Sequence, residues 1–97
     1  GKAVALKTDY AQAWNNLGVA LHALEALEEA RGAYLKAQKL DPRYADPYYG
    51  MARLHLAAGR SAEAHGAFRD FLDRTARPPS DESVQKAVAY LAGRERP

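Results

Sequence analysis

The sequence predicts an all-α protein built of repeated helix pairs. Three observations indicate this fold class: part of the chain repeats after 34 residues, alanine fills 21 of the 97 positions, and apolar residues recur every three or four positions. Alanine is the best helix former because it loses no side-chain entropy on folding. A fixed period of this length is typical of stacked repeat units. Such an architecture favours a scaffold over a catalytic pocket.

The repeat is visible at aromatic, aliphatic and small positions. Paired across the offset, they are Trp14 and Tyr48, Leu17 and Met51, Ala30 and Ala64, Ala33 and Ala67, and Tyr34 and Phe68. The two copies predict a single domain over residues 1–97, with full repeats at 9–42 and 43–76. We expect a partial repeat at 1–8 and a capping helix at 80–93 to complete it.

The first full repeat predicts two helices, at 11–24 and 27–40. Thr8 or Asp9 can cap the first, and residues 2–7 are expected to be the last turns of an earlier, incomplete helix. Asp41-Pro42 ends the second, because the residue before proline disfavours the helical region. The expected packing stripe of the first helix is Trp14, Leu17, Gly18, Leu21 and Leu24.

The second repeat carries clearer boundaries. Asp46-Pro47 is expected to start a helix at 47–58, with Asp46 as the cap and proline at the first position. Gly59 then closes it in a left-handed conformation, and Ser61 caps a helix at 62–74. Ser80 is expected to cap the final helix. Its expected buried stripe is Val84, Ala87, Val88 and Leu91.

This pattern resembles the tetratricopeptide repeat family. The matching residues are Trp14, Leu17 and Gly18 on the first helix, and Ala30, Tyr34, Ala37 and Pro42 on the second. The resemblance implies a right-handed α-solenoid of antiparallel helix pairs, with the first helix of each pair on the concave side. The second copy departs from the family pattern at His55, Phe71 and Ala76, which indicates an array approaching its end.

The concave face implied by the resemblance carries the candidate partner-binding residues. They are Gln12, Asn15, Val19, His22, Asp46, Tyr49, Arg53 and Leu56. Amides pair with a peptide backbone, a guanidinium with a carboxylate, and an aromatic ring with an apolar side chain. The predicted function is therefore a protein–protein interaction scaffold that binds a peptide or protein partner. Any one of these side chains alone would be an ordinary solvent-facing residue, and only the set indicates a binding surface.

Two alternatives remain open at this point. The chain is a self-assembly or complex-assembly element if its open N-terminal edge, with Val4, Leu6 and Tyr10, packs on another copy or on a longer array. It is otherwise an accessory segment of a larger protein. The subset of the family that grips chaperone C-terminal carboxylates is a poor match, because Val19 and Asp46 stand where an asparagine and a basic residue are needed.

Several function classes are disfavoured. There is no cysteine, the three serines are in helix-start positions, and no glycine-rich phosphate loop occurs, so no enzyme is predicted. No cofactor or metal is predicted either, since no carboxylate pattern accompanies His22 and His55. The net charge of +2 is spread among interleaved acids and bases, which argues against nucleic-acid binding. No stretch is long and apolar enough for a membrane span. The alanine and arginine content suggests a bacterial source, and the compartment stays open.

Overall fold

The computed structural model describes the backbone of residues 2–93 and the side chains of residues 8–93. Within that part the chain forms helices and no strand. They are α1 (Lys2–Ala23), α2 (Leu27–Leu40), α3 (Asp46–Ala57), α4 (Ser61–Arg74) and α5 (Glu82–Leu91). The predicted all-α class is confirmed.

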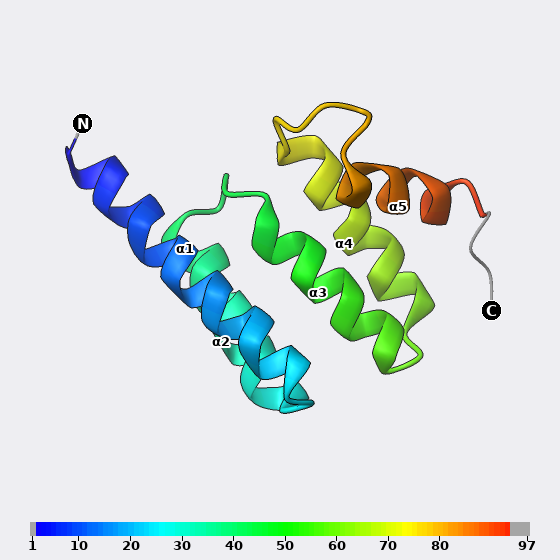
Figure 1. Cartoon of the computed structure of the whole chain (residues 1–97), viewed down its shortest axis with the longest axis horizontal. Coiled ribbons are helices and arrows are strands. Elements are labelled where there is room, and N and C mark those ends of the chain that lie inside the picture. Colours follow the sequence, from blue (N-terminus) through cyan, green and yellow to red (C-terminus); the bar gives the residue numbers. More distant parts are fainter. Residues whose placement is uncertain (1, 94–97) are drawn as a thin grey trace.

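The helices stack in pairs (Figure 1). Helices α1 and α2 form one antiparallel pair and α3 and α4 the next, while α2 and α1 both contact α3. Helix α5 packs on α4 at the other end of the stack. The result is an α-solenoid in which α1 forms one end and α5 the other.

The first core is built around one aromatic side chain of α2. Tyr34 is completely buried. A Cβ atom on Gly18 of α1 would lie 2.7 Å from the Tyr34 ring, and one on Gly50 of α3 would lie 2.4 Å from it. Both distances are below van der Waals contact, so the ring lies directly against two helix backbones. One side chain therefore holds three helices together, and glycine is required on both sides of it.

The second core joins α3, α4 and α5. Phe71 is completely buried and Phe68 nearly so. The ring centroid of Phe71 lies 5.1 Å from that of Tyr49 on α3, and the centroid of Phe68 lies 5.0 Å from that of Tyr90 on α5. These aromatic contacts fix α5 over the second pair and hold Tyr49 in a defined orientation on α3.

The predicted break before the first repeat is wrong. Helix α1 runs through Thr8 and Asp9 without interruption. Thr8 stands where the first full repeat has the helix-breaking Pro42, so nothing in the local sequence stops the helix. The Thr8 hydroxyl donates a hydrogen bond to Asp41 Oδ2 at 2.8 Å instead of capping a helix. The side chains of Val4 and Leu6 lie outside the described residues.

Three predicted caps also need correction. Ser61 and Asp46 are the first residues of α4 and α3, with Arg60 and Ala45 at the cap positions, where neither makes a side-chain cap bond. The cap of α5 is Asp81 rather than Ser80. Asp81 Oδ1 accepts hydrogen bonds from the backbone N–H groups of the second and third residues of the helix, at 2.9 and 3.3 Å. A carboxylate satisfies two amides there.

The turns between helices behave as predicted. Gly59 has φ of +75°, and the break between α1 and α2 contains Glu25 at φ of +62°. Helix α2 ends at Leu40, immediately before Asp41-Pro42.

The predicted packing stripe of α1 is largely on the surface. Trp14, Leu17 and Leu24 are 37%, 45% and 77% exposed. The buried positions of α1 are Ala11, Asn15 and Gly18, which lie on a neighbouring face of the helix. Helices α2 and α3 cover that side, whereas no described residue covers the other. On α5, Val88 is likewise 51% exposed, because α4 covers only the Val84 and Ala87 side.

Candidate partner-binding groove

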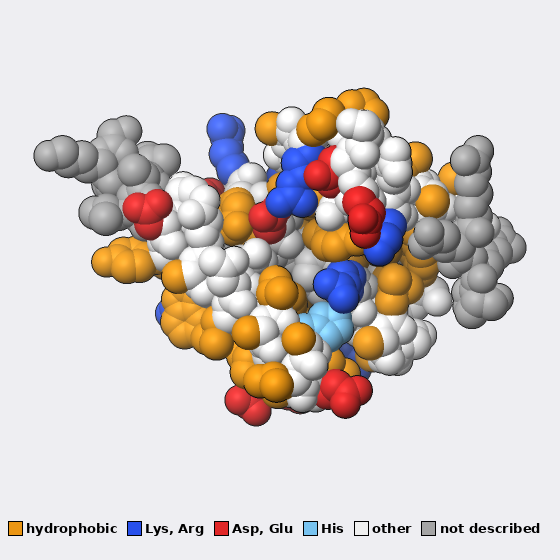
Figure 2. Space-filling view, in the orientation of Figure 1, with side chains coloured by type: hydrophobic (Ala, Val, Ile, Leu, Met, Phe, Trp, Pro, Cys, Tyr) orange, Lys and Arg blue, Asp and Glu red, His pale blue; other side chains and the backbone are white. Residues whose placement is uncertain are grey.

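Helices α1 and α3, together with the linker between α4 and α5, line a pocket of about 160 Å³. Five residues predicted from the sequence line it: Asn15, Val19, Asp46, Tyr49 and Arg53. Three that were not predicted line it too: Tyr34, Gly50 and Arg77. The pocket opens on the face shown in Figure 2, where acidic and basic side chains gather around a hollow.

A second hollow of about 380 Å³ adjoins the first. Val19 and Arg53 line both, and His22 lines the second. Gln12 is exposed, and Leu56 is 41% exposed, and neither lines either hollow. The structure therefore brings six of the eight predicted residues to one continuous groove. Residues of α1 and α3 contribute all six.

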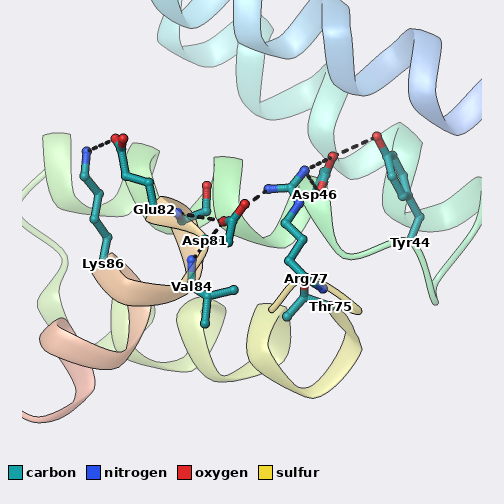
Figure 3. A network of polar contacts seen from close by, with 9 residues as sticks. Tyr44, Asp46, Thr75, Arg77, Asp81, Glu82, Val84 and Lys86 are labelled. Carbon is teal, nitrogen blue, oxygen red and sulfur yellow. Dashed lines mark hydrogen bonds and ion pairs between the residues drawn. The ribbon is translucent and has the colours of Figure 1, made fainter. Parts of the chain in front are cut away.

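One end of the groove is closed by a polar network (Figure 3). The Tyr44 hydroxyl donates to Asp46 Oδ2 at 3.1 Å, and Arg77 Nη2 lies 2.9 Å from Asp46 Oδ1. Arg77 also reaches Asp81, the α5 cap, at 4.0 Å. Burial, followed by the charge of Asp46 and the hydrogen bond to it, raises the pKa of Tyr44 to about 12. The Asp46 carboxylate is therefore already paired with Arg77 and hydrogen-bonded by Tyr44.

Arg53 differs from the other basic groups in and near the groove. Lys86 on α5 pairs with Glu82 at 3.2 Å, and Arg77 pairs with Asp46. Among the described residues, Arg53 makes no ion pair and no hydrogen bond, although its side chain lies between the two hollows. The groove therefore presents one guanidinium whose five donors are open to a ligand.

Comparisons with known proteins agree with this geometry. The family model for the tetratricopeptide repeat matches residues 11–44. A heat shock protein sti1 homolog from Schizosaccharomyces pombe is 36% identical over 103 aligned positions, which cover 94% of this chain. The chain belongs to the tetratricopeptide repeat family. It spans only 17% of the length of that relative, so the activity of the whole relative is not transferred.

As a tetratricopeptide repeat protein, the chain has a general role in protein–protein interaction. The family and the relative point to a non-catalytic protein. No helix in the described part of the chain has the length and hydropathy to cross a membrane. The relative is a yeast protein, so the comparisons give no support to the predicted bacterial source.

The residues that sequence reasoning missed have different signals. Tyr34 stands in the sequence as a match to the family pattern; in the structure its ring is buried between two glycines and also borders the groove. The residue equivalent to Gly50 in the other copy of the repeat is not a glycine, and this difference between the copies could have marked the position. Arg77 lies in a linker outside the repeat period, so no periodicity could place it.

The floor of the groove holds polar atoms that lack partners. Asn15 is 6% exposed, and its Oδ1 atom is buried without a hydrogen bond among the described residues. The same is true of the Tyr34 hydroxyl, and burial raises the pKa of Tyr34. Leaving such groups unsatisfied is costly. The groove floor therefore places two buried polar atoms, Asn15 Oδ1 and the Tyr34 hydroxyl, at the edge of the apolar cluster around Tyr34.

Two half-buried histidines give the fold a pH dependence. Burial, and next the charge of Arg53, lowers the pKa of His22, and burial lowers that of His55. A histidine whose folded pKa is lowered contributes stability above the unfolded value of about 6.5 and loses it as the pH falls below that value. We expect the urea midpoint to be lower at about pH 5.5 than at about pH 7.5.

Single substitutions assign the effect. His22→Gln should flatten this dependence in part, whereas His65→Gln, at an exposed site on α4, should leave it unchanged. A midpoint that stays constant over this range, or rises on acidification, would contradict the assignment.

Proposed function

We propose that the groove between α1 and α3 binds an acidic peptide segment of a protein partner, with Arg53 holding a carboxylate. The observation that carries this proposal is the unpaired Arg53 guanidinium at the junction of the two hollows. A charge-assisted hydrogen bond to a carboxylate is about twice as strong as a neutral one. The remaining cations nearby, Arg77 and Lys86, are already paired with Asp46 and Glu82.

The surroundings of Arg53 suit a peptide rather than a small ion. Tyr49 is held edge-on against Phe68 with ring centroids 5.9 Å apart, so it offers a rigid ring beside the guanidinium. Val19 is 46% exposed and adds apolar surface from the facing helix. A rigid aromatic ring beside a charged anchor is typical of interface hot spots. Together they support a ligand with an acidic residue next to an apolar one.

The acidic group is proposed to be a side chain rather than a chain terminus. A carboxylate-terminus clamp needs several converging donors. Here Val19 and the Asp46 carboxylate, already paired with Arg77, line the pocket beside Arg53, the one unpaired cation among the described residues that line it. A basic peptide is disfavoured because the Asp46 carboxylate already forms an ion pair with Arg77.

A peptide array tests the proposal. Every peptide is C-terminally amidated, and each acidic member is paired with a member that carries glutamine or asparagine in place of each acid. We expect the acidic members to bind about tenfold or more tightly than their amide partners, the range of one charge-assisted bond. The variant Arg53→Glu with Tyr49→Ala should abolish that preference.

Arg69→Glu makes the same charge change on the exposed side of α4 and is the matched control. It should leave binding within about twofold of the parent chain, because it reaches the groove only through screened charge. Equal binding by the groove variant and by the control would refute the role of Arg53. Preference for the amide members would refute the acidic-peptide proposal as a whole.

A further inference from the structure

The floor of the 160 Å³ pocket carries two polar groups that the acidic residue of the proposed ligand does not use. Asn15 is 6% exposed and Tyr34 is completely buried, and both residues line the pocket. Asn15 Oδ1 and the Tyr34 hydroxyl have no hydrogen-bond partner among the described residues. A buried polar group without a partner is costly. A ligand group that supplied both missing partners would therefore bind more tightly than one that did not.

The two groups reach this floor from different helices. The Tyr34 ring comes from α2 and passes between Gly18 of α1 and Gly50 of α3. A Cβ atom on Gly50 would lie 2.4 Å from Tyr34 Cζ, the ring carbon that bears the hydroxyl, and Gly50 itself lines the pocket. Asn15 lies three residues before Gly18, on the same buried face of α1. The pocket floor is thus formed where α1, α2 and α3 meet.

The charges around the pocket favour a neutral group on this floor. Arg53 lines the pocket, so an ammonium group entering beside it would be repelled. The Asp46 carboxylate also lines the pocket, and Asn15 Oδ1 is an acceptor, so a carboxylate on the floor would meet a like charge and a second acceptor. An apolar group would leave both floor groups unpaired. The occupant that the floor favours is therefore neutral and polar.

A primary carboxamide fits these requirements better than a hydroxyl group does. It carries two donor hydrogens on its nitrogen and a separate acceptor oxygen. Its N–H can donate to Asn15 Oδ1 while its oxygen accepts from the Tyr34 hydroxyl. A serine or threonine hydroxyl has to serve both groups with one atom. A pocket of about 160 Å³ has room for a side chain, since a cavity of about 150 Å³ admits benzene.

We propose that this pocket takes the side-chain carboxamide of a glutamine or asparagine that neighbours the acidic residue of the partner peptide. Asn15 accepts a hydrogen bond from the carboxamide, Tyr34 donates one to it, and Arg53 holds the adjacent carboxylate. Asn15 and Tyr34 are then specificity-determining residues of the groove. This assignment rests on the proposed function, because both side chains belong to the same peptide.

A positional scan of the tightest acidic peptide from the array tests the assignment. The acid is kept, and each neighbouring position carries glutamine, methionine or threonine in turn. Methionine has the length and flexibility of glutamine without its amide. Every member ends in a dimethylamide and has no other glutamine or asparagine, so no second primary carboxamide is present. At one position we expect glutamine to bind about tenfold or more tightly than methionine.

Two variants remove the floor groups with little change of shape. Tyr34→Phe and Asn15→Leu should each reduce the glutamine-to-methionine affinity ratio by about threefold, and the double variant should abolish it. All of them should keep the preference for an acid that Arg53 supplies. Tyr10→Phe makes the same chemical change as Tyr34→Phe at a site on α1 that is 60% exposed, and it should leave the ratio unchanged.

The outcomes separate this assignment from the proposed function. If the acid preference holds but glutamine binds no better than methionine at any position, the carboxamide pocket is wrong and the groove stands. Threonine binding as tightly as glutamine, or a glutamine advantage that survives in the double variant, would also overturn the assignment. So would a Tyr34→Phe variant that weakens all members equally, because the hydroxyl would then bind the peptide backbone. Loss of the acid preference in the parent chain would refute the proposed function and the carboxamide pocket with it.

Discussion

Tyr34→Ala is expected to lower the free energy of unfolding by about 3–5 kcal/mol, the range for truncating a buried aromatic side chain. The ring contacts the backbones of α1 and α3 at Gly18 and Gly50, so its removal opens a space at the junction of three helices. Tyr34→Phe is the matched control. It keeps the ring and removes a buried hydroxyl that lacks a partner among the described residues, so it should be neutral or stabilising.

Urea denaturation of the parent chain, Tyr34→Ala and Tyr34→Phe tests this role of the ring. The expected order of midpoints places the alanine variant well below the other two, with the phenylalanine variant equal to or above the parent chain. A phenylalanine variant that is clearly less stable would mean that the hydroxyl makes a stabilising bond in solution. An alanine variant within about 1 kcal/mol of the parent would contradict the role of the ring.

Gly50→Ala is expected to destabilise the protein by about 1–3 kcal/mol, the usual cost of overpacking. The change is notable because alanine in a helix interior is otherwise better than glycine by about 0.5–1 kcal/mol. The steric cost arises because the added methyl group would lie 2.4 Å from the Tyr34 ring. Gly66→Ala on α4 is the control, since nothing lies within 4 Å of its Cβ position, and it should stabilise.

We therefore expect denaturation curves to show that the two glycine variants change the free energy of unfolding in opposite directions. The steric origin can be checked in the Tyr34→Ala background, where Gly50→Ala should lose most of its cost. Two variants that both stabilise would contradict the packing of the Tyr34 ring against Gly50. So would a destabilisation by Gly50→Ala that persists when the ring is absent.

The repeat made the fold predictable, because a helix pair that recurs at a fixed offset leaves few ways to bury its apolar positions. Helix starts were less predictable. Several polar residues stand near each start, and which one caps is decided by competing partners; Asp46, for example, is held by Tyr44 and Arg77. Exposure was least predictable of all. Trp14 and Leu17 have the residue types of a core, yet burial depends on a neighbouring helix that the local pattern does not specify.

The groove followed only in part from the family resemblance. Asn15, Val19 and Arg53 belong to the concave face that the resemblance implies, and the structure places them around one pocket. That Arg53 is the basic side chain left without a partner there, within the described part of the chain, could not be foreseen. It depends on Arg77, whose linker folds back to Asp46 from 31 residues away. Long-range pairing of this kind leaves no local trace in the sequence.

Binding of an acidic peptide at Arg53 is the central claim about this protein. The most direct measurement is the amide NMR spectrum of the chain as the tightest acidic peptide from the array is added. We expect the signals of Val19, Tyr49 and Arg53 to shift most, and those of the outer helices α2 and α4 to stay in place. Shifts confined to the outer helices, or to the Ala13 and Leu17 face of α1, would contradict the claim.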